Sequence, residues 1–272
     1  MSDFTVRTEY IDDGPAEGLA ALLDVPLPDL DTGLPLLWHW VYLLDRAAQA
    51  DLGADGHPVR HAVPAPPEPG RRRMWAGGQV RMLAPLRTGR SATRRTQVTA
   101  VEDKQGRSGR LTFVTVSHQI TQADTLVIDE RQDIVYRDAP PAQQAGAPQM
   151  LPEMPVAQDD WPITVTPTLL FRYSALTYNA HRIHYDRDYA RDIEGYPGLL
   201  THGPLQAVAM AEAARARGHR ASDTQVFDYR LVSPLFDHQG LIARADPSAD
   251  GGRISTSVRD KFGRETATGV LS

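Results

Sequence analysis

Strand-like runs rich in Thr and Val occur in two groups, one in each half of the chain. These β-branched residues favour strands over helices. Turn-forming residues separate neighbouring runs at 105–106, 250–252 and 262–263. The predicted strands are 91–102, 108–119 and 125–136 in the first half and 241–245, 253–260 and 265–271 in the second. Each half is therefore predicted to form an antiparallel sheet.

Two segments have the length and apolar content of helices. The first is Leu36–Ala50, which reads LLWHWVYLLDRAAQA, and the second is the Ala-rich segment Pro204–Arg217. Pro204 suits the first turn of a helix, where its missing N–H would lack a partner anyway, and Gly218 suits the end of one. The apolar side of the second helix consists of Leu205, Val208, Ala209 and Ala213. We expect an antiparallel sheet to wrap a long helix.

A short repeat indicates that the fold is duplicated. Arg81–Leu86 reads RMLAPL, and Arg230–Leu235 reads RLVSPL. Each stretch lies between a predicted helix and the predicted strands that follow it. Because the same order of elements occurs twice, we predict an α+β chain made of two copies of one small fold.

Two Pro-rich stretches are predicted to connect folded parts. Residues 57–70 hold five prolines, and residues 138–160 are rich in Pro, Ala and Gln. Proline removes a backbone donor and fixes φ, so neither stretch can be a regular helix or a central strand. We predict a first domain at 1–140, a connection at 141–160 and a second domain at 161–272.

The composition excludes several classes of protein. The 272 residues carry a formal net charge of -5, which argues against a dedicated nucleic-acid binder. The chain has no Cys, which excludes a disulfide scaffold, an iron–sulfur cluster and a thiol nucleophile. No apolar run approaches the length of a membrane span, and the acidic N-terminus lacks the features of a secretory signal. We expect a soluble, cytoplasmic protein.

The segment from Phe171 to Gln206 holds an unusual density of polar side chains. Three of the nine histidines, His181, His184 and His202, fall within 22 residues. Burying such groups without partners is costly, so a functional site explains them better than a core does. His181 and His184 could bind a metal from one face, could be structural, or could transfer protons near neutral pH.

A turn precedes the predicted second helix. His202 and Gly203 come directly before Pro204, so the Gly203 amide lies at a helix N-terminus. Free N–H groups and the helix dipole favour negative charge there, and glycine allows a ligand to approach the backbone closely. This arrangement suits a thioester carbonyl whose oxygen gains negative charge in a transition state.

These residues resemble the MaoC-like dehydratase and hydratase family of the hotdog superfamily. That family has a Ser-Gly-Asp-x-Asn-Pro-x-His segment, followed by a His-Gly turn that opens the central helix. Here Thr177 to His184 reads TYNAHRIH and precedes His202-Gly203 with the same order and spacing. Asn179 stands where the family has its catalytic Asp, and His181-Arg182 replace Asn-Pro.

The chain is more similar still to a double-hotdog subgroup, over residues 35–272. This subgroup is the hydroxyacyl-thioester dehydratases type 2, which includes mesaconyl-CoA and itaconyl-CoA hydratases. The matching residues are Arg172–Thr177, Asn179, His181–Asp186, Gly195–Leu199, His202–Leu205, Trp38–Trp40 and Arg72–Gly78. The resemblance implies a double hotdog, in which two antiparallel sheets each wrap a central helix, and an acyl-CoA hydratase or dehydratase.

The resemblance also implies roles for individual residues. His184 and Asn179 would handle water and protons, and the Gly203 amide would polarise the thioester carbonyl. Because a carboxamide cannot be a general base, His184 would carry most of the proton transfer, with His181 as a candidate to share it. Candidate substrate-binding residues are Arg172, Tyr173, His181, Arg182, His202, Trp38, Trp40 and Trp75.

The expected substrate is a short, branched C5 dicarboxylic enoyl-CoA. Arg172 and Arg182 would suit its free carboxylate, because guanidinium binds carboxylate through two parallel hydrogen bonds. No metal or cofactor is expected, since coenzyme A is part of the substrate, and a homodimer is possible. Two alternatives stay open: a 3-hydroxyacyl-carrier dehydratase of fatty-acid synthesis, and a non-catalytic acyl-CoA-binding protein that has lost its Asp.

Overall fold

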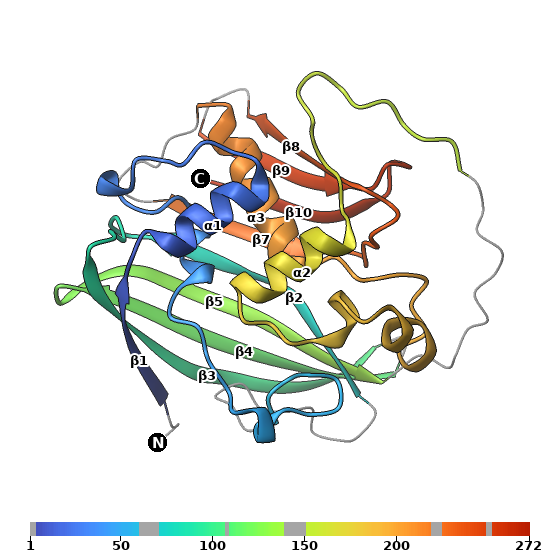
Figure 1. Cartoon of the computed structure of the whole chain (residues 1–272), viewed down its shortest axis with the longest axis horizontal. Helices are drawn as coiled ribbons and strands as arrows, with labels where there is room; N and C mark the ends of the chain where they lie inside the picture. Colours follow the sequence, from blue (N-terminus) through green and yellow to red (C-terminus); the bar gives the residue numbers. More distant parts are fainter. Residues whose placement is uncertain (1–3, 60–70, 107–108, 139–150, 219–224, 249–251) are drawn as a thin grey trace. The chain divides into compact units, whose positions relative to one another are not determined.

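A computed structural model describes residues 4–59, 71–106, 109–138, 151–218, 225–248 and 252–272 (Figure 1). The chain divides into two compact units. Of the described residues, the first unit contains those up to 138 together with 176–178 and 225–228, and the second contains the rest. The two units are described separately below.

The first unit is an antiparallel sheet with a short helix, α1 (Gly14–Leu23). Its strands lie in the order β1–β3–β4–β5–β2. Along β4 every second side chain is buried from Thr112 to Gln122, as expected for a strand with one face on a core. The strands are β1 (Phe4–Ile11), β2 (Arg71–Met82), β3 (Arg90–Gly106), β4 (Gly109–Gln122) and β5 (Thr125–Asp138).

The predicted helix at 36–50 is wrong. This segment holds only two short 3₁₀ turns, η2 (Trp38–Val41) and η3 (Gln49–Asp51), and another turn, η1 (Leu30–Thr32), precedes it. Leu37 and Leu43 adopt left-handed φ angles of 69° and 53°, which interrupt a right-handed helix on either side of η2. Tyr42 then hydrogen-bonds α1, accepting from Ala16 N–H and donating to Asp12 O. Tertiary contacts therefore override the helical tendency of the segment.

The first strand and helix of the second unit are β6 (Trp161–Ile163) and α2 (Pro167–Leu176), of which only the last residue, Leu176, is assigned to the first unit. Two short turns follow, the 3₁₀ turn η4 (Arg182–His184) and the π-helical turn η5 (Tyr189–Ile193). The helix α3 (Gly203–Ala216) comes next, and the remaining strands are β7 (Gln225–Leu231), β8 (Leu241–Pro247), β9 (Ile254–Arg259) and β10 (Glu265–Leu271). The order of the strands is β7–β10–β9–β8–β6, with only residues 229–231 of β7 in this unit.

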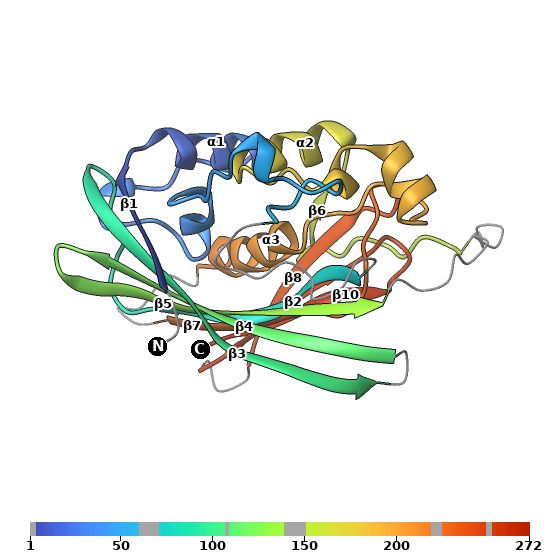
Figure 2. The same cartoon turned by 90° about the horizontal axis from the view of Figure 1, so that it is seen from below.

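The predicted second helix is confirmed as α3, which packs on β8, β9 and β10 (Figure 1, Figure 2). Every residue from Leu205 to Ala214 is buried, so the helix is enclosed on all sides and not on the predicted apolar side alone. Its polar residues are satisfied, because Gln206 Oε1 accepts from Thr266 at 2.7 Å and Glu212 pairs with Arg215 at 2.6 Å. Gly218 follows the helix with a left-handed φ of 81°.

The short sequence repeat has the same structure in both units. In the first, Leu83 and Ala84 N–H both donate to Val127 O, and Leu34 N–H donates to Leu86 O. In the second, the matching Val232 and Ser233 donate to Thr266 O, and Thr201 donates to Leu235 O. Leu86 and Leu235 are both fully buried. The repeat therefore marks equivalent positions in two copies of one fold.

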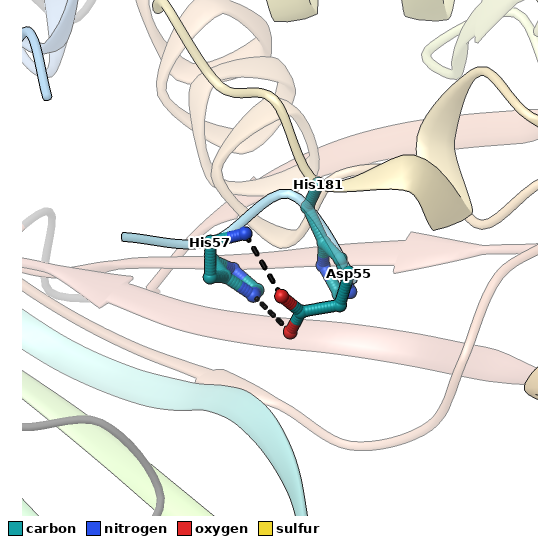
Figure 3. A group of neighbouring side chains, drawn as sticks. All are labelled: Asp55, His57 and His181. Atoms are coloured by element: carbon teal, nitrogen blue, oxygen red, sulfur yellow. Dashed lines mark hydrogen bonds and ion pairs between the residues drawn. The ribbon is translucent and has the colours of Figure 1, made fainter. Parts of the chain in front are cut away.

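The predicted strands are confirmed, with boundaries that extend by a few residues in β3 to β5. Sequence patterns missed β1, β2, β6 and β7, and they also missed the helices α1 and α2. Most of the predicted linker at 57–70, and half of the connection at 141–160, lie outside the described residues. The turn before 57–70 is ordered by Asp55, whose carboxylate accepts from His57 N–H and Nδ1, each at 3.0 Å (Figure 3). No helix within the described residues is long and apolar enough to cross a membrane.

Candidate active site

The candidate site begins where α2 ends. Asn179 N–H donates to Ser174 O at 2.8 Å across a left-handed Tyr178, whose φ is 53°. The bond joins an N–H to a carbonyl five residues earlier in the chain, and the residue just before the donor is left-handed. This pattern is the Schellman motif, which commonly ends a helix. Glycine or asparagine usually takes the left-handed position, so a tyrosine there strains the backbone by about 1–2 kcal/mol. The turn fixes the direction in which Asn179 leaves the helix.

The side chain of Asn179 is held by the next turn of the chain. Its Oδ1 accepts from His181 N–H at 3.0 Å. Because a backbone N–H can only donate, this bond assigns the oxygen and leaves the amide NH₂ as the free end of the side chain. Asn179 can therefore donate a hydrogen bond to a ligand or a water molecule, whereas an aspartate would accept one.

His184 lies at the end of η4, and its ring orientation is fixed by a backbone carbonyl. The side chain is buried, with 6% of the residue exposed. Its Nδ1 is 2.7 Å from Leu200 O. A carbonyl only accepts, so Nδ1 carries the hydrogen and the neutral ring presents the lone pair of Nε2. This tautomer is the one that a general base at Nε2 requires.

The carbonyl that orients His184 belongs to a firmly held segment, Leu199 to Thr201. Leu200 N–H donates to Ile183 O at 3.0 Å, and Thr201 N–H donates to Leu235 O at 2.7 Å. Leu199 exchanges two bonds with Asp237, its N–H donating to Oδ1 at 3.1 Å and its carbonyl accepting from the Asp237 N–H at 2.9 Å. These bonds fix the position of Leu200 O and hence of the His184 ring.

His202 stacks on His184. The two ring centroids are 3.6 Å apart and the planes differ by 17°. His202 Nε2 lies 2.9 Å from Ser174 Oγ, and the ring of Tyr173 meets the His202 ring edge-on at 4.8 Å. Burial, followed by the charge of His184, holds the pKa of His202 well below its usual 6.5. His202 is therefore a neutral ring at neutral pH.

Gly203 opens α3 directly after this stack. A Cβ at this position would lie 2.1 Å from Leu231 Cδ1, so any larger residue here would displace the end of the half-buried Leu231 side chain. Among the described residues, the Gly203 N–H has no acceptor. The group is thus a free donor at the positive end of a helix, as the sequence predicts for an oxyanion site.

The other predicted binding residues of this unit lie in different environments. Tyr173 is buried, and burial raises the pKa of its hydroxyl. His181 is buried with its ring 5.5 Å from that of His184. Arg182 donates to Asp186 at 2.8 and 3.1 Å and lies over the Tyr189 ring. Arg172 is exposed on α2, with no hydrogen bond or ion pair to any described residue.

The three predicted tryptophans belong to the first unit. Trp38 is fully buried, whereas Trp40 and Trp75 are half-buried with ring centroids 5.5 Å apart. Trp40 Nε1 donates to Glu130 Oε1 at 2.9 Å, and His39 Nε2 lies 3.0 Å from Glu130 Oε2. Burial alone would raise the pKa of Glu130, but the His39 partner holds it at about 2. An ionised carboxylate thus anchors the indole of Trp40.

Sequence patterns missed two features of the site. The Leu200 carbonyl orients His184, yet a backbone acceptor leaves no mark in the residue type. Ser174 has no predicted role, although a serine inside an apolar helix turn is a signal that a side-chain bond is made there. The structure brings Asn179, His181, His184, His202 and Gly203 into one unit, as their spacing in the sequence suggests.

Comparison with known proteins supports the resemblance. The family model for hydroxyacyl-thioester dehydratase type 2 matches residues 37–237. The chain is 47% identical over 252 residues to mesaconyl-C(4)-CoA hydratase of Chloroflexus aurantiacus, with 90% of this chain and 88% of the relative covered.

Solved structures agree on the fold. HtdX of Mycobacterium tuberculosis matches with a TM-score of 0.69 and 16% identity over 99% of each chain. Another Mycobacterium tuberculosis protein, described as having a double hotdog fold, matches with a TM-score of 0.56 and 16% identity over 100% of this chain and 96% of its own. The chain therefore belongs to the hydroxyacyl-thioester dehydratase type 2 family of hydro-lyases and has the double hotdog fold.

Proposed function

We propose that this protein adds water across the double bond of a mesaconyl-CoA thioester linked through C4. The observation that carries the proposal is the 47% identity to mesaconyl-C(4)-CoA hydratase over 90% of the chain. In such a substrate the carbon β to the thioester bears a methyl group and the free carboxylate. Hydration places the hydroxyl on that carbon and the proton on the α-carbon.

His184 is the proposed acid–base group. The bond from Nδ1 to Leu200 O places the ring hydrogen on Nδ1, so Nε2 is the atom that takes a proton from water as the oxygen attacks the β-carbon. The imidazolium then returns this proton to the α-carbon, so the ring ends each cycle neutral. One group can serve both steps because the proton removed from water is the one that the product needs.

Asn179 is the proposed ligand for the attacking water. Its Oδ1 is already used by His181 N–H, so its NH₂ donates to the water oxygen. This bond leaves the water hydrogens free to point toward His184. An amide in place of the carboxylate of related enzymes therefore fits a one-base reaction, in which water is oriented by Asn179 and deprotonated by His184.

The Gly203 N–H is the proposed donor to the thioester oxygen. Attack at the β-carbon moves charge to that oxygen and forms an enolate. A free N–H at a helix N-terminus stabilises the enolate without rearrangement, and loss of one such donor typically costs about 10²–10³ in kcat. Because the bond strengthens as charge develops, it lowers the barrier more than it tightens substrate binding.

Arg172 is the proposed partner of the free carboxylate. Of the two arginines that flank the motif, Arg182 is engaged by Asp186, and Asp186 in turn accepts from Tyr189 N–H. Arg172 has no such partner among the described residues. Arg172→Gln is expected to raise KM for a dicarboxylic thioester and leave KM for crotonyl-CoA unchanged. Equal effects on both substrates would contradict this role.

A substrate panel tests the proposed function. Purified protein is incubated with mesaconyl-C4-CoA, itaconyl-CoA and crotonyl-CoA and with a medium-chain 3-hydroxyacyl thioester, and water gain or loss is followed by mass spectrometry. The highest kcat/KM is expected for mesaconyl-C4-CoA, with His184→Ala as the inactive control.

Other outcomes would support other functions. Preference for the 3-hydroxyacyl thioester would favour the dehydratase reaction that gives the family its name. Preference for itaconyl-CoA would keep the C5 dicarboxylic substrate class but replace mesaconyl-C4-CoA as the proposed substrate. Binding of every thioester without turnover would favour a non-catalytic acyl-CoA-binding protein. A cytoplasmic location and a homodimer are further proposals, and light scattering of the purified protein tests the second.

A further inference from the structure

Ser174 makes two hydrogen bonds that lead to different parts of the site. Its carbonyl accepts from Asn179 N–H at 2.8 Å, and its Oγ lies 2.9 Å from His202 Nε2. Ser174 is itself buried near the end of α2. One residue thus connects the proposed water ligand with the ring that stacks on His184.

The Ser174 hydroxyl controls the orientation of His202. The other ring nitrogen, Nδ1, is buried and has no hydrogen-bond partner among the described residues. His202 is 1% exposed, so water offers its ring no alternative partner at the surface. The bond to Ser174 is therefore the polar contact that sets the rotation of the His202 ring, with Tyr173 packed against it edge-on.

The orientation of His202 in turn limits the His184 ring. A hydrogen bond at Nδ1 fixes one atom of His184 but still permits the ring plane to tilt about that atom. A stacked ring at a centroid distance of 3.6 Å restricts this tilt, because the two rings are already in van der Waals contact and a rotation would make their atoms overlap. The bond to Leu200 and the stack together define the direction of Nε2.

We propose that Ser174 and His202 form a positioning pair for His184, in which the Ser174 hydroxyl sets the His202 ring and the stacked ring aims Nε2 at the substrate. This inference rests on the proposed function, and it gives His202 a role other than the substrate contact that the sequence suggests. Neither residue needs to touch the reacting atoms.

A neutral partner suits this role. When His184 takes a proton from water, a second cation stacked on it would oppose the transfer. Burial holds the pKa of His202 below its usual value, so this ring stays neutral and adds no like charge. The stack therefore does not oppose the imidazolium that forms during the reaction.

Two variants and a matched control test the proposal. Ser174→Ala removes the hydroxyl and keeps the His202 ring, whereas His202→Phe keeps a flat ring and removes its bond to Ser174. Thr266→Val is the control. It also deletes a buried hydroxyl group, whose hydrogen bond goes to Gln206 of α3, but it leaves the stack of His184 and His202 intact. All three are expected to lose some stability. Only the first two are expected to lower kcat, by roughly 10- to 100-fold, with KM changed by less than about twofold.

A spectroscopic measurement separates positioning from a general loss of structure. In protein labelled with ¹⁵N-histidine, the Nδ1–H signal of His184 is identified by its absence in His184→Ala. This signal is expected to shift or broaden in Ser174→Ala and His202→Phe and to stay unchanged in Thr266→Val. The substrate-free enzyme is used, so the result does not depend on the identity of the thioester.

The outcomes distinguish this proposal from the proposed function. A rise in KM with unchanged kcat in His202→Phe would overturn positioning in favour of substrate contact. An unchanged kcat and His184 signal in Ser174→Ala would overturn it outright. If wild-type protein turns over no thioester, the proposed function fails, and the His184 signal alone decides whether the pair positions the ring.

Discussion

Gly203→Ala tests why glycine is required at the start of α3. The added Cβ would lie 2.1 Å from Leu231 Cδ1 and 3.4 Å from Leu231 Cγ. Carbon atoms in contact are separated by about 3.5–4.0 Å, so either the helix or the leucine must move by roughly 1.5 Å. Overpacking of this kind costs about 1–3 kcal/mol of stability. A displacement of about 1 Å at a reacting group can reduce the rate by about 10²-fold.

The structure also predicts how the defect is repaired. The Cβ points at Leu231, so Leu231→Ala in the same chain should provide the space that the alanine needs. The double variant is expected to be more stable than the sum of the single effects by about 1–2 kcal/mol, a coupling typical of residues in contact. Its kcat is expected to recover toward that of Leu231→Ala, because the first turn of α3 can return to its place with the N–H of position 203 still without an acceptor.

Urea unfolding and steady-state kinetics of the four proteins in this cycle give both quantities. If Gly203 serves only helix packing, stability and kcat should recover together in the double variant. Recovery of stability without recovery of kcat would refute the packing argument. It would mean that a methyl group at position 203 obstructs the ligand itself, whatever space Leu231 leaves.

Four further predictions concern the site and the core. His184→Ala is expected to lower kcat by at least about 100-fold with the fold retained, as judged by circular dichroism and kinetics. Asn179→Asp keeps an acceptor for His181 N–H but loses the NH₂ donor, so kcat should fall about tenfold at unchanged stability; a more active variant would contradict the proposed water ligand. Glu130→Gln is expected to destabilise the fold by about 3–5 kcal/mol in urea, because it removes the charge that faces His39. The depressed pKa of His202 means that the unfolded chain binds a proton below pH 6.5 while the folded chain does not, so stability should fall as the pH drops below that value, and fall less in His202→Phe.

The parts of the fold that the sequence predicts are those determined by local patterns. Thr- and Val-rich runs become β3, β4 and β5, because β-branched side chains alternate between a core face and an open face. Pro204 and Gly218 bound the helix α3 for equally local reasons. The same logic fails at 36–50, where apolar content suggests a helix. Bonds from His39 and Trp40 to Glu130, which lies about 90 residues away in the sequence, hold the segment in another conformation.

The site shows a similar division between local and distant determinants. The order of Asn179, His184 and Gly203 along the chain is enough to suggest which groups act together. Their geometry depends on partners with no characteristic residue type, above all the carbonyls of Leu200 and Ser174. A sequence motif can therefore suggest His184 as the proton carrier, but only the structure identifies the tautomer of His184 and the ring that is stacked on it.

Equivalent hydrogen bonds show which residues of the first copy occupy the positions of the proposed site. Leu34 and Thr201 donate to equivalent carbonyls, so Pro35 and Leu36 occupy the positions of His202 and Gly203. The carbonyl of Pro35 accepts the first bond of the 3₁₀ turn η2, as the carbonyl of His202 accepts the first bond of α3. Proline has no aromatic ring to stack, and leucine carries a Cβ, which at position 203 would lie 2.1 Å from Leu231 Cδ1. In the first copy a 3₁₀ turn follows these two residues in place of an α-helix, so this short stretch has no counterpart of the stacked ring, the small residue or the helix N-terminus of the proposed site.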